Sequence, residues 1–322
     1  MSTQPFESIF QAAEKGTATD VKYFIENGAD VNAKDKDDEG FRDNWTPLHY
    51  AARFNSNVEV LKYLISQGAN INVKISGGWT PLNHAAFNSN VEVLKYFHSL
   101  GCDVNVKTRN DDTLLHWAAG YNSNIDILQY LILQGGDVYA RDANGWTPLH
   151  YSARNRNIEI LKYLVSQGVD VNVKTNDGNT PLNLAARVNS SIRVLKYLMS
   201  QGSDVNTKNE EGSTPLHGAI GNNTNVDWYN FNREVVKLFV SQGADVNAKD
   251  KRGRTPLHLA VWNISNDAKI LQHLILQGAD VNARDEEGRT PLDFTGVQEK
   301  TNMAEKKRIL REMGGKSGKE LT

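Results

Sequence analysis

Cysteine is nearly absent from this sequence, because Cys102 is the only one among 322 residues. A single thiol excludes disulfides within the chain and is typical of a protein in a reducing compartment. Apolar runs are short as well, and none approaches the ~20 residues that cross a bilayer. The first residues lack a basic segment followed by an apolar core, so no signal peptide is predicted. We expect a protein without a membrane span, in the cytoplasm or delivered into a host cytosol.

An excess of either charge is also lacking. The net charge is −2 and the isoelectric point is near 6.5. Nucleic-acid-binding proteins usually carry a basic excess or a basic stripe. The overall charge therefore argues against nucleic acid as the partner.

One tetrapeptide, Thr-Pro-Leu-His or a close variant, occurs eight times along the chain. Its copies begin at Thr46, Thr80, Thr113, Thr147, Thr180, Thr214, Thr255 and Thr290. The intervals between neighbouring copies are 34, 33, 34, 33, 34, 41 and 35 residues. A nearly fixed period of this length is typical of a stacked repeat array, in which each repeat packs on its neighbours. We therefore expect a repeat protein rather than a globular enzyme.

The copy over residues 45–73 shows how one repeat forms two helices. Thr46 is a suitable N-cap, the proline after it favours the first helical position, and His49 can bond back to the cap. After this short helix, the Asn-Ser-Asn segment 55–57 supplies a turn and a second N-cap. Apolar residues at offsets of 0, 3, 6 and 7 then predict a second helix, which Gly68 ends in the left-handed conformation.

An extended segment of the type Ala-Asp-Val-Asn-Ala-Lys-Asp and a Gly-containing turn connect one repeat to the next. This pattern predicts a β-hairpin-like loop. Helix, turn, helix and hairpin at a period of about 33 residues resembles the ankyrin repeat. The TPLH series, the double alanines and the LKYLISQG-like and GADVNAKD-like segments carry the resemblance over roughly residues 6–313. It implies an all-α solenoid whose concave face, made of hairpins and first helices, usually binds a partner protein.

The copies also predict how the chain is divided. Residues 1–34 are expected to be an N-terminal capping repeat, because their helices lack the TPLH start. Residues 35–283 are expected to hold seven ankyrin repeats, and residues 284–313 a C-terminal capping repeat with a highly charged helix. Residues 314–322 are expected to form a flexible tail.

Two segments are longer than in the other copies. The first hairpin is extended over residues 35–44, and an inserted loop over residues 222–232 joins two predicted helices. The extended hairpin is either a tolerated surface insertion or a contact to a partner. The aromatic side chains of the inserted loop either fold back over the array or anchor a partner. The aromatic residues concerned are Phe41, Trp228, Tyr229 and Phe231.

The concave side should carry the residue before each motif threonine and the residues after each double alanine. These positions are mostly aromatic in the first half of the chain and mostly polar in the second. Exposed Trp and Tyr with nearby Arg dominate interface energetics, so we expect a partner to bind the aromatic half. A tryptophan before the threonine would alternatively cover the base of its hairpin. The candidate contact residues are Trp45, Arg53, Phe54, Trp79, Phe87, Tyr121, Trp146, Arg154, Arg187 and Trp262.

A basic residue also recurs once per linker, and we call this series the Lys/Arg ladder. Its members are Lys34, Lys74, Lys107, Arg141, Lys174, Lys208, Lys249 and Arg284. Such a series would suit nucleic acid or an acidic partner. An aspartate follows four of these residues directly, which favours a solvated edge whose charge is compensated locally.

Constellations of catalytic or metal-binding residues are not recognisable. Five of the eight histidines belong to the TPLH motif, and His84, His98 and His273 lack Cys, Asp or Glu at ligand spacing. Cys102 has no base near it in sequence, which predicts an inert thiol. An enzyme would need a site in the two insertions or the tail. We predict a monomeric, non-catalytic scaffold for another protein, with no metal, cofactor or small-molecule substrate; binding along the Lys/Arg ladder is the alternative.

Overall fold

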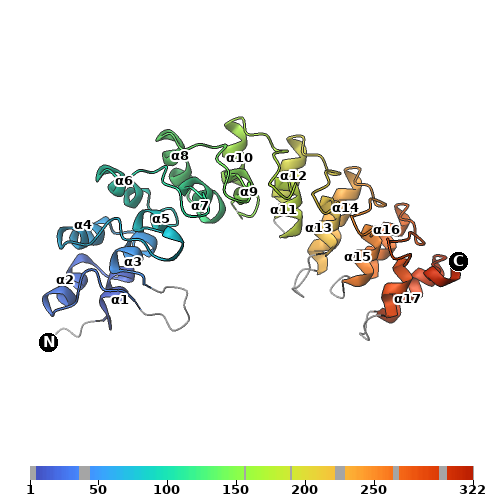
Figure 1. Cartoon of the computed structure of the whole chain (residues 1–322), viewed down its shortest axis with the longest axis horizontal. Helices are drawn as coiled ribbons and strands as arrows, with labels where there is room; N and C mark the ends of the chain where they lie inside the picture. The colour runs from blue at the N-terminus through green and yellow to red at the C-terminus, as the bar shows by residue number, and fades with distance from the viewer. Residues whose placement is uncertain are drawn as a thin grey trace. The chain divides into compact units, whose positions relative to one another are not determined.

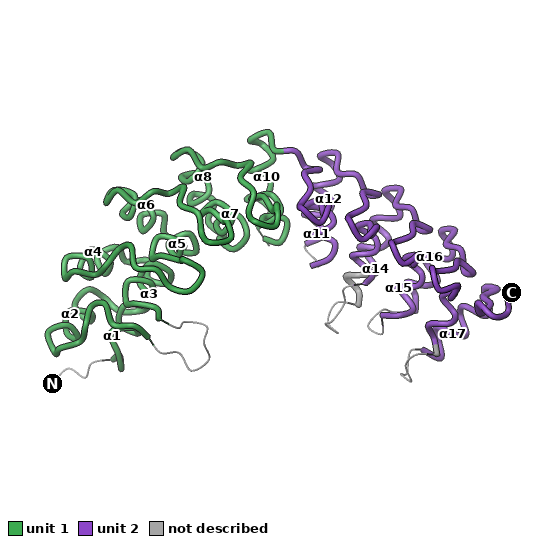
Figure 2. Tube along the Cα trace, in the orientation of Figure 1, with its two compact units in different colours: residues 1–169 green, residues 170–322 purple. Residues whose placement is uncertain are grey.

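The computed structural model describes residues 5–35, 44–155, 157–188, 191–221, 229–263, 268–296 and 303–321. These residues form helices joined by turns, and they contain no β-strand (Figure 1). The all-α fold predicted from the repeat pattern is therefore confirmed. The chain divides into two compact units, unit 1 (residues 1–169) and unit 2 (residues 170–322) (Figure 2).

The described part of unit 1 is built from helix pairs. They are α1 (Ile9–Lys15) with α2 (Ala18–Glu26), α3 (Pro47–Phe54) with α4 (Val58–Ser66), α5 (Pro81–Ala85) with α6 (Val91–Ser99), α7 (Leu114–Tyr121) with α8 (Ile125–Leu133), and α9 (Pro148–Ser152) with α10 (Ile158–Ser166). A 3₁₀ helix, η1 (Ser76–Gly78), precedes α5. The first helices of neighbouring pairs contact each other, for example α1 with α3 and α7 with α9. The second helices do the same, for example α4 with α6.

Unit 2 repeats this arrangement. Its pairs are α11 (Pro181–Arg187) with α12 (Ile192–Ser200), α13 (Pro215–Gly221) with α14 (Tyr229–Ser241), α15 (Pro256–Trp262) with α16 (Ala268–Leu276), and η3 (Pro291–Gly296) with α17 (Met303–Glu312); η4 (Gly318–Leu321) follows. The inserted segment predicted as a loop over 222–232 is partly helical, because α14 already begins at Tyr229. The insertion thus lengthens α14, which has 13 residues where α12 has nine.

The first helices begin as the TPLH motif predicts. The Thr46 backbone N–H donates to Nδ1 of His49 at 3.1 Å. The same bond joins Thr113 to His116, Thr147 to His150, Thr214 to His217, and Thr255 to His258. Where asparagine replaces histidine, the side-chain oxygens of Asn83 and Asn183 accept this bond at 2.9 and 3.0 Å. Because the first N–H groups of a helix have no partner within it, the bond fixes where each helix starts.

In the described repeats that follow α1, α3, α5, α7 and α13, a buried asparagine after the first helix joins the repeat to the one before it. Asn122 is 3% exposed, and its Nδ2 donates to the carbonyl oxygens of Ala86 and Asn88, both at 2.8 Å. Equivalent bonds run from Asn55 to Ala13 and Gly16, from Asn88 to Ala52 and Asn55, from Asn155 to Ala119 and Asn122, and from Asn263 to Ile220. These amides satisfy carbonyl groups at the end of the preceding first helix.

Substituting one of these buried asparagines should therefore be costly. We expect Asn122→Ala to lower the free energy of unfolding by about 2–4 kcal/mol, because buried carbonyl groups would lose their donor. Urea denaturation followed by circular dichroism measures the change. Asn124→Ala is the matched control: Asn124 is more exposed, caps α8 by accepting from the Asp126 N–H at 2.9 Å, and donates to the Ser89 carbonyl, in an exposed hydrogen bond whose carbonyl water can solvate in the variant. Its loss should cost about 1 kcal/mol, and equal costs for both variants would contradict this explanation.

The structure differs from the flexible tail predicted over residues 314–322. The Lys316 N–H donates to Oδ1 of Asn282 at 2.8 Å, and the Gly318 N–H donates to the Asp293 carboxylate at 2.7 Å. Arg311 and Glu320 form a two-pronged ion pair at 2.8 and 3.0 Å. Asn282 thus bonds Lys316 as linker asparagines bond the next repeat elsewhere in unit 2. The segment up to residue 321 continues the repeat pattern.

Candidate functional site

Rings from the first helices and hairpins of unit 1 form a row that we call the aromatic surface. It consists of Trp45, Phe54, Trp79, Phe87, Trp117, Tyr121 and Trp146. The rings of Trp79 and Trp117 lie 4.6 Å apart, and Phe87 contacts Trp79, Trp117 and Tyr121 at 5.8 Å in each case. The buried rings of His84 and Tyr151 connect this centre to Trp45 and Trp146. The row is therefore continuous across the repeats.

Exposure differs along the aromatic surface. Tyr121 is 52% exposed and Phe54 is 42% exposed, while Phe87 is half-buried. Trp79, Trp117 and Trp146 are half-buried as well. The outward orientation predicted for Trp45 is wrong, because this side chain is only 7% exposed. Its ring packs 4.1 Å from His84 in α5 and 5.3 Å from Tyr50 in α3, so Trp45 is packed against the first helices of two neighbouring repeats.

Two arginines lie over these rings. The Arg53 guanidinium is 4.0 Å from the centre of the Phe87 ring, and the exposed Arg154 lies 5.8 Å from Trp146. Both distances are within the range of cation–π attraction. Asp112 and Asp142 are buried nearby, and the Tyr151 hydroxyl, which has one proton to share between them, lies 2.7 and 3.0 Å from their carboxylate oxygens. The arginines therefore bring positive charge to an aromatic surface whose nearby carboxylates are covered.

Burial also sets the charge of His84. This ring is 3% exposed, and burial lowers the pKa of His84 well below 6.5, with further lowering from the charges of His49 and Arg53. At neutral pH the ring is uncharged, and its Nδ1 lies 3.5 Å from the Arg53 guanidinium. Nε2 of His84 and Nε1 of Trp117 have no hydrogen-bond partner within the described ranges.

Sequence reasoning missed Trp117, His84 and Tyr151 as members of this region. All three occupy the position directly after the TPLH motif, which follows the helix N-cap by four residues. In unit 1 this position is occupied by Tyr50, His84, Trp117 and Tyr151, and in unit 2 by Leu184, Gly218, Leu259 and Phe294. Aligning the repeats on their TPLH motifs would therefore have shown that this position carries a ring in every copy of unit 1.

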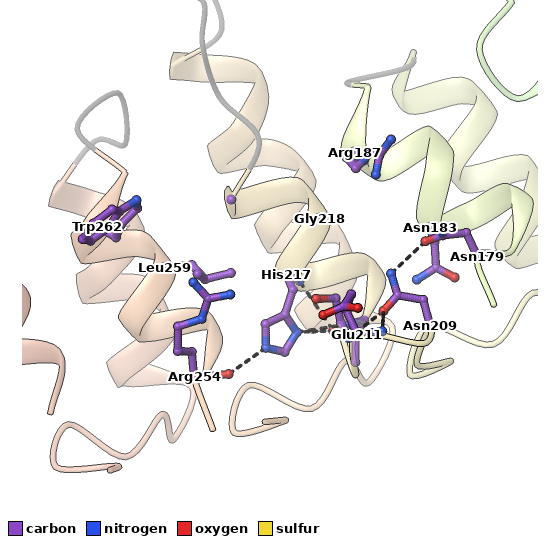
Figure 3. A pocket seen from close by; sticks show the side chains of 13 residues that line it. Asn179, Asn183, Arg187, Asn209, Glu211, His217, Gly218, Arg254, Leu259 and Trp262 are labelled. Atoms are coloured by element: carbon purple, nitrogen blue, oxygen red, sulfur yellow. Dashed lines mark hydrogen bonds between the residues drawn. The ribbon is translucent and has the colours of Figure 1, made fainter. Parts of the chain in front are cut away.

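The other candidates are distributed as follows. Arg187 and Trp262 belong to unit 2, where both line a pocket of about 330 Å³ (Figure 3). Phe41 and Trp228 lie outside the described residues. For Tyr229 and Phe231 only the backbone, within α14, is described. Their contacts to a partner stay predictions.

The Lys/Arg ladder has a structural role in unit 2. Nζ of Lys208 donates to the Lys249 carbonyl at 3.0 Å, and Nζ of Lys249 donates to the Arg284 carbonyl at 2.9 Å. The neighbouring aspartates pair elsewhere, Asp250 with Arg254 at 2.7 Å and Asp285 with Arg289 at 2.9 Å. The predicted local compensation by these aspartates is therefore wrong in unit 2. The Lys208 and Lys249 side chains there bind backbone carbonyls of the following linker.

No group of three or more His, Cys, Asp and Glu side chains in the described ranges is arranged to hold a metal ion. Among the same residues, no helix is both long and apolar enough to cross a membrane. Burial raises the pKa of the Cys102 thiol, which favours its unreactive protonated form.

Comparison with known proteins gives consistent matches. A family model of ankyrin repeats (3 copies) matches residues 9–108, 90–175, 115–209, 172–250, 188–285 and 229–305. Putative ankyrin repeat protein FPV233 of Fowlpox virus (strain NVSL) is 42% identical over 50 residues, 16% of this chain and 9% of that protein. A putative ankyrin repeat protein of Rickettsia bellii (strain RML369-C) is 39% identical over 83 residues, 24% of this chain and 45% of that protein. The chain thus spans less than half the length of either relative.

A solved structure is similar as well. The crystal structure of the human ASB11 ankyrin repeat domain matches with a TM-score of 0.60 and 24% sequence identity. The match covers 73% of this chain and 99% of that domain. At this identity the likeness concerns the fold.

Proposed function

Because the chain belongs to the ankyrin-repeat family, we propose that it is a non-catalytic scaffold that binds another protein through its aromatic surface. Ankyrin repeats are generally protein–protein interaction modules. The finer proposal is supported mainly by the exposed rings of Phe54 and Tyr121 at the edge of a row of stacked rings. Aromatic side chains with nearby arginine are the groups that most often dominate binding energy at protein interfaces.

The physical basis of binding is burial of rings that are already held in place. Tyr121 stacks on Trp117 at 5.6 Å, and Phe54 stacks on Trp45 at 6.2 Å. Side chains fixed in this way lose little conformational entropy when a partner covers them. The partner would cover Phe54 and Tyr121 with apolar groups and place hydrogen-bond acceptors against Arg53 and Arg154.

The cellular compartment and the oligomeric state are part of the proposal. We place it in the cytosol, of the producing cell or of a host, where the lone thiol of Cys102 would stay reduced. We also propose that the chain acts as a monomer. The Lys/Arg ladder supports no second proposal, because Lys208 and Lys249 are engaged with backbone carbonyls.

The test removes the exposed rings and follows binding of selected partners. A displayed library of protein fragments is first selected on the wild-type chain, and the dissociation constants of the recovered fragments are then measured. We expect the Phe54→Ala/Tyr121→Ala variant to bind at least about tenfold more weakly, as for central interface aromatics. Both side chains are substantially exposed, so the fold should be retained.

Leu133→Ala/Leu276→Ala is the matched control. These leucines end second helices and are 80% and 73% exposed, so the control also removes two exposed apolar side chains. We expect this variant to bind like the wild type. Fragments that bind the Phe54→Ala/Tyr121→Ala variant with wild-type affinity would exclude the aromatic surface as the binding site.

A further inference from the structure

Second helices of unit 1 carry a recurring ion pair on their exposed side. The Lys62 ammonium lies 2.7 Å from the carboxylate of Glu59, three residues earlier in α4. The same pair joins Lys95 to Glu92 at 2.7 Å and Lys162 to Glu159 at 2.9 Å. Each glutamate belongs to the first turn of its helix, where a negative charge also interacts favourably with the helix dipole. These pairs are therefore neutral and stabilise their helices.

The first second helix of unit 2 departs from this pattern. Counted from the helix ends, α12 has Arg193 at the position of Glu59 and keeps Lys196 at the position of Lys62. Both side chains are exposed, and neither has an ionic partner among the described residues. The first turn of α12 contains no acidic residue. The two positive charges are thus not neutralised within their helix.

Arginine at position 193 is unfavourable for the helix that carries it. A positive charge in the first turn opposes the helix dipole, and two like charges three residues apart repel each other. Within the described part of the chain the Arg193 side chain forms no hydrogen bond, so no contact offsets these costs. A residue that breaks a local rule without a structural gain is typical of a functional position.

The next two second helices extend the positive charge. Lys237 in α14 occupies the position of Lys62, and Lys269 in α16 occupies that of Glu59; both are exposed. Burial and, as the smaller cause, the charge of Lys237 lower the pKa of His273 in α16, so Lys237 lies close to that helix. Lys269 is engaged in an interaction of its own and precedes His273 by one turn. We call Arg193, Lys196, Lys237 and Lys269 the basic face.

The helices of the basic face belong to three successive repeats of unit 2 (Figure 1). α12 and α14 pack on α11 and α13, which contact each other, and α14 contacts α16. Glu234 is the only acidic residue in α12, α14 and α16. No ion pair between described side chains joins Glu234 to Lys237. Positive charge therefore predominates on all three helices.

Charge and spacing indicate the kind of ligand. Packed helices lie about 8–10 Å apart, which an extended chain covers in about three residues. Carboxylates at every third position of a bound segment would therefore meet one repeat each. Nucleic acid fits less well, because the net charge of the chain is −2 and DNA-binding proteins contact roughly 6–10 phosphates. Basic residues alone also bind membranes weakly, since stable anchoring needs a second signal.

We propose that the basic face binds an acidic segment of a protein, extended across the second helices of unit 2, with carboxylates against Arg193, Lys196 and Lys237. The proposal rests on the proposed function in one respect, namely that the chain binds proteins. Its residues lie on other helices than those of the aromatic surface. Either surface can therefore fail without the other.

The experiment titrates a blocked, fluorescein-labelled peptide with the full chain and follows its anisotropy. The peptide has three glutamates, one at every third position, separated by glycine and serine. We expect saturable binding in 50 mM NaCl that weakens at least about fivefold in 200 mM NaCl, because exposed charges are screened by salt. A peptide with glutamine in place of glutamate should not bind.

A matched pair of variants tests the assignment. Lys196→Glu should weaken peptide binding about tenfold, because one ion pair is lost and a like charge is introduced. Lys162→Glu makes the same charge change at the same helix position in unit 1, and it should leave the affinity within about twofold. Phe54→Ala/Tyr121→Ala should bind the peptide like the wild type, which separates the basic face from the aromatic surface.

Arg193→Glu tests the cost of the arginine. This variant restores the glutamate of the unit 1 pattern, so it should weaken the peptide about tenfold and yet raise the melting temperature by about 1–2 °C. A lower melting temperature would mean that Arg193 has a structural role, which would contradict the proposal.

The remaining outcomes would also overturn it. Absence of binding, or equal effects of Lys196→Glu and Lys162→Glu, would show that the basic face is only a solvated surface. Tighter binding of a thymidine oligonucleotide of equal charge would make it a nucleic-acid site. Tighter binding to vesicles of phosphatidylcholine with phosphatidylserine, lost in Lys196→Glu, would make it a lipid site.

Discussion

Lowering the pH from 7 to about 4.5 is expected to reduce the free energy of unfolding by several kcal/mol, because buried motif histidines resist protonation. His49 is fully buried, and burial lowers its pKa from 6.5 to about 4, against the smaller opposing effect of a hydrogen bond to the Trp79 backbone. Burial is also the main cause of the lowered pKa values of His84, His116, His217 and His258.

The sign follows from the direction of these pKa shifts. Each histidine has a lower pKa in the folded chain than in the unfolded chain, so the unfolded chain binds more protons below pH 6.5. The stabilising effect is complete above pH 6.5 and is lost progressively as the pH falls towards the folded pKa, about 4 for His49. Each pH unit in that window costs about 1.4 kcal/mol per histidine, so His49 alone accounts for roughly 3 kcal/mol.

Asparagine provides a matched substitution for this test. Asn83 and Asn183 occupy the histidine position of the motif and form the same bond to the preceding threonine. His49→Asn should therefore keep the helix cap while removing one titrating group. Urea denaturation at pH steps between 7 and 4.5 gives the free energy of unfolding as a function of pH. In the variant, the slope of this plot should correspond to about one proton fewer than in the wild type. An unchanged slope would mean that His49 is not a source of the acid sensitivity.

Replacing Lys306 with alanine is expected to destabilise the last repeat by about 3–5 kcal/mol, because buried acceptors would lose their donor and the packed aliphatic stem would be removed. Lys306 is fully buried in α17. Its Nζ donates to the carbonyl oxygens of Ala260 at 3.0 Å and Asn263 at 2.8 Å. It thus takes the place of the buried asparagine that joins earlier repeats.

Hydrogen exchange of α16 and α17 measures this effect, because repeat arrays open locally and a single global unfolding free energy can miss it. Lys307→Ala is the control, since Lys307 is the exposed neighbour of Lys306 on the same helix and its loss should change little. Lys306→Met retains an apolar stem without the donor. Full protection in Lys306→Met would show that packing, and not hydrogen bonding, is what Lys306 contributes.

The repeat pattern predicted the helices well because the forces that start and end them are local. The bond from the Thr46 N–H to His49 spans three residues, and Gly68 ends α4 with a positive φ of 90°. The start of the first helix and the end of the second can therefore both be predicted from a few consecutive residues. The start of α14 at Tyr229 was missed because the residue directly before it in the sequence, Trp228, is not a typical N-cap residue. The binding of Lys316 to Asn282 was missed because it joins residues far apart in the sequence.

The sequence by itself determined the repeat, its helix starts and the aromatic composition of unit 1. Only the tertiary structure decided that Trp45 is buried against His84 while Tyr121 is exposed, and that Lys306 is enclosed among carbonyl groups. The physical reason is that exposure of a side chain depends on the neighbouring repeats. Helix capping, in contrast, depends on a few consecutive residues.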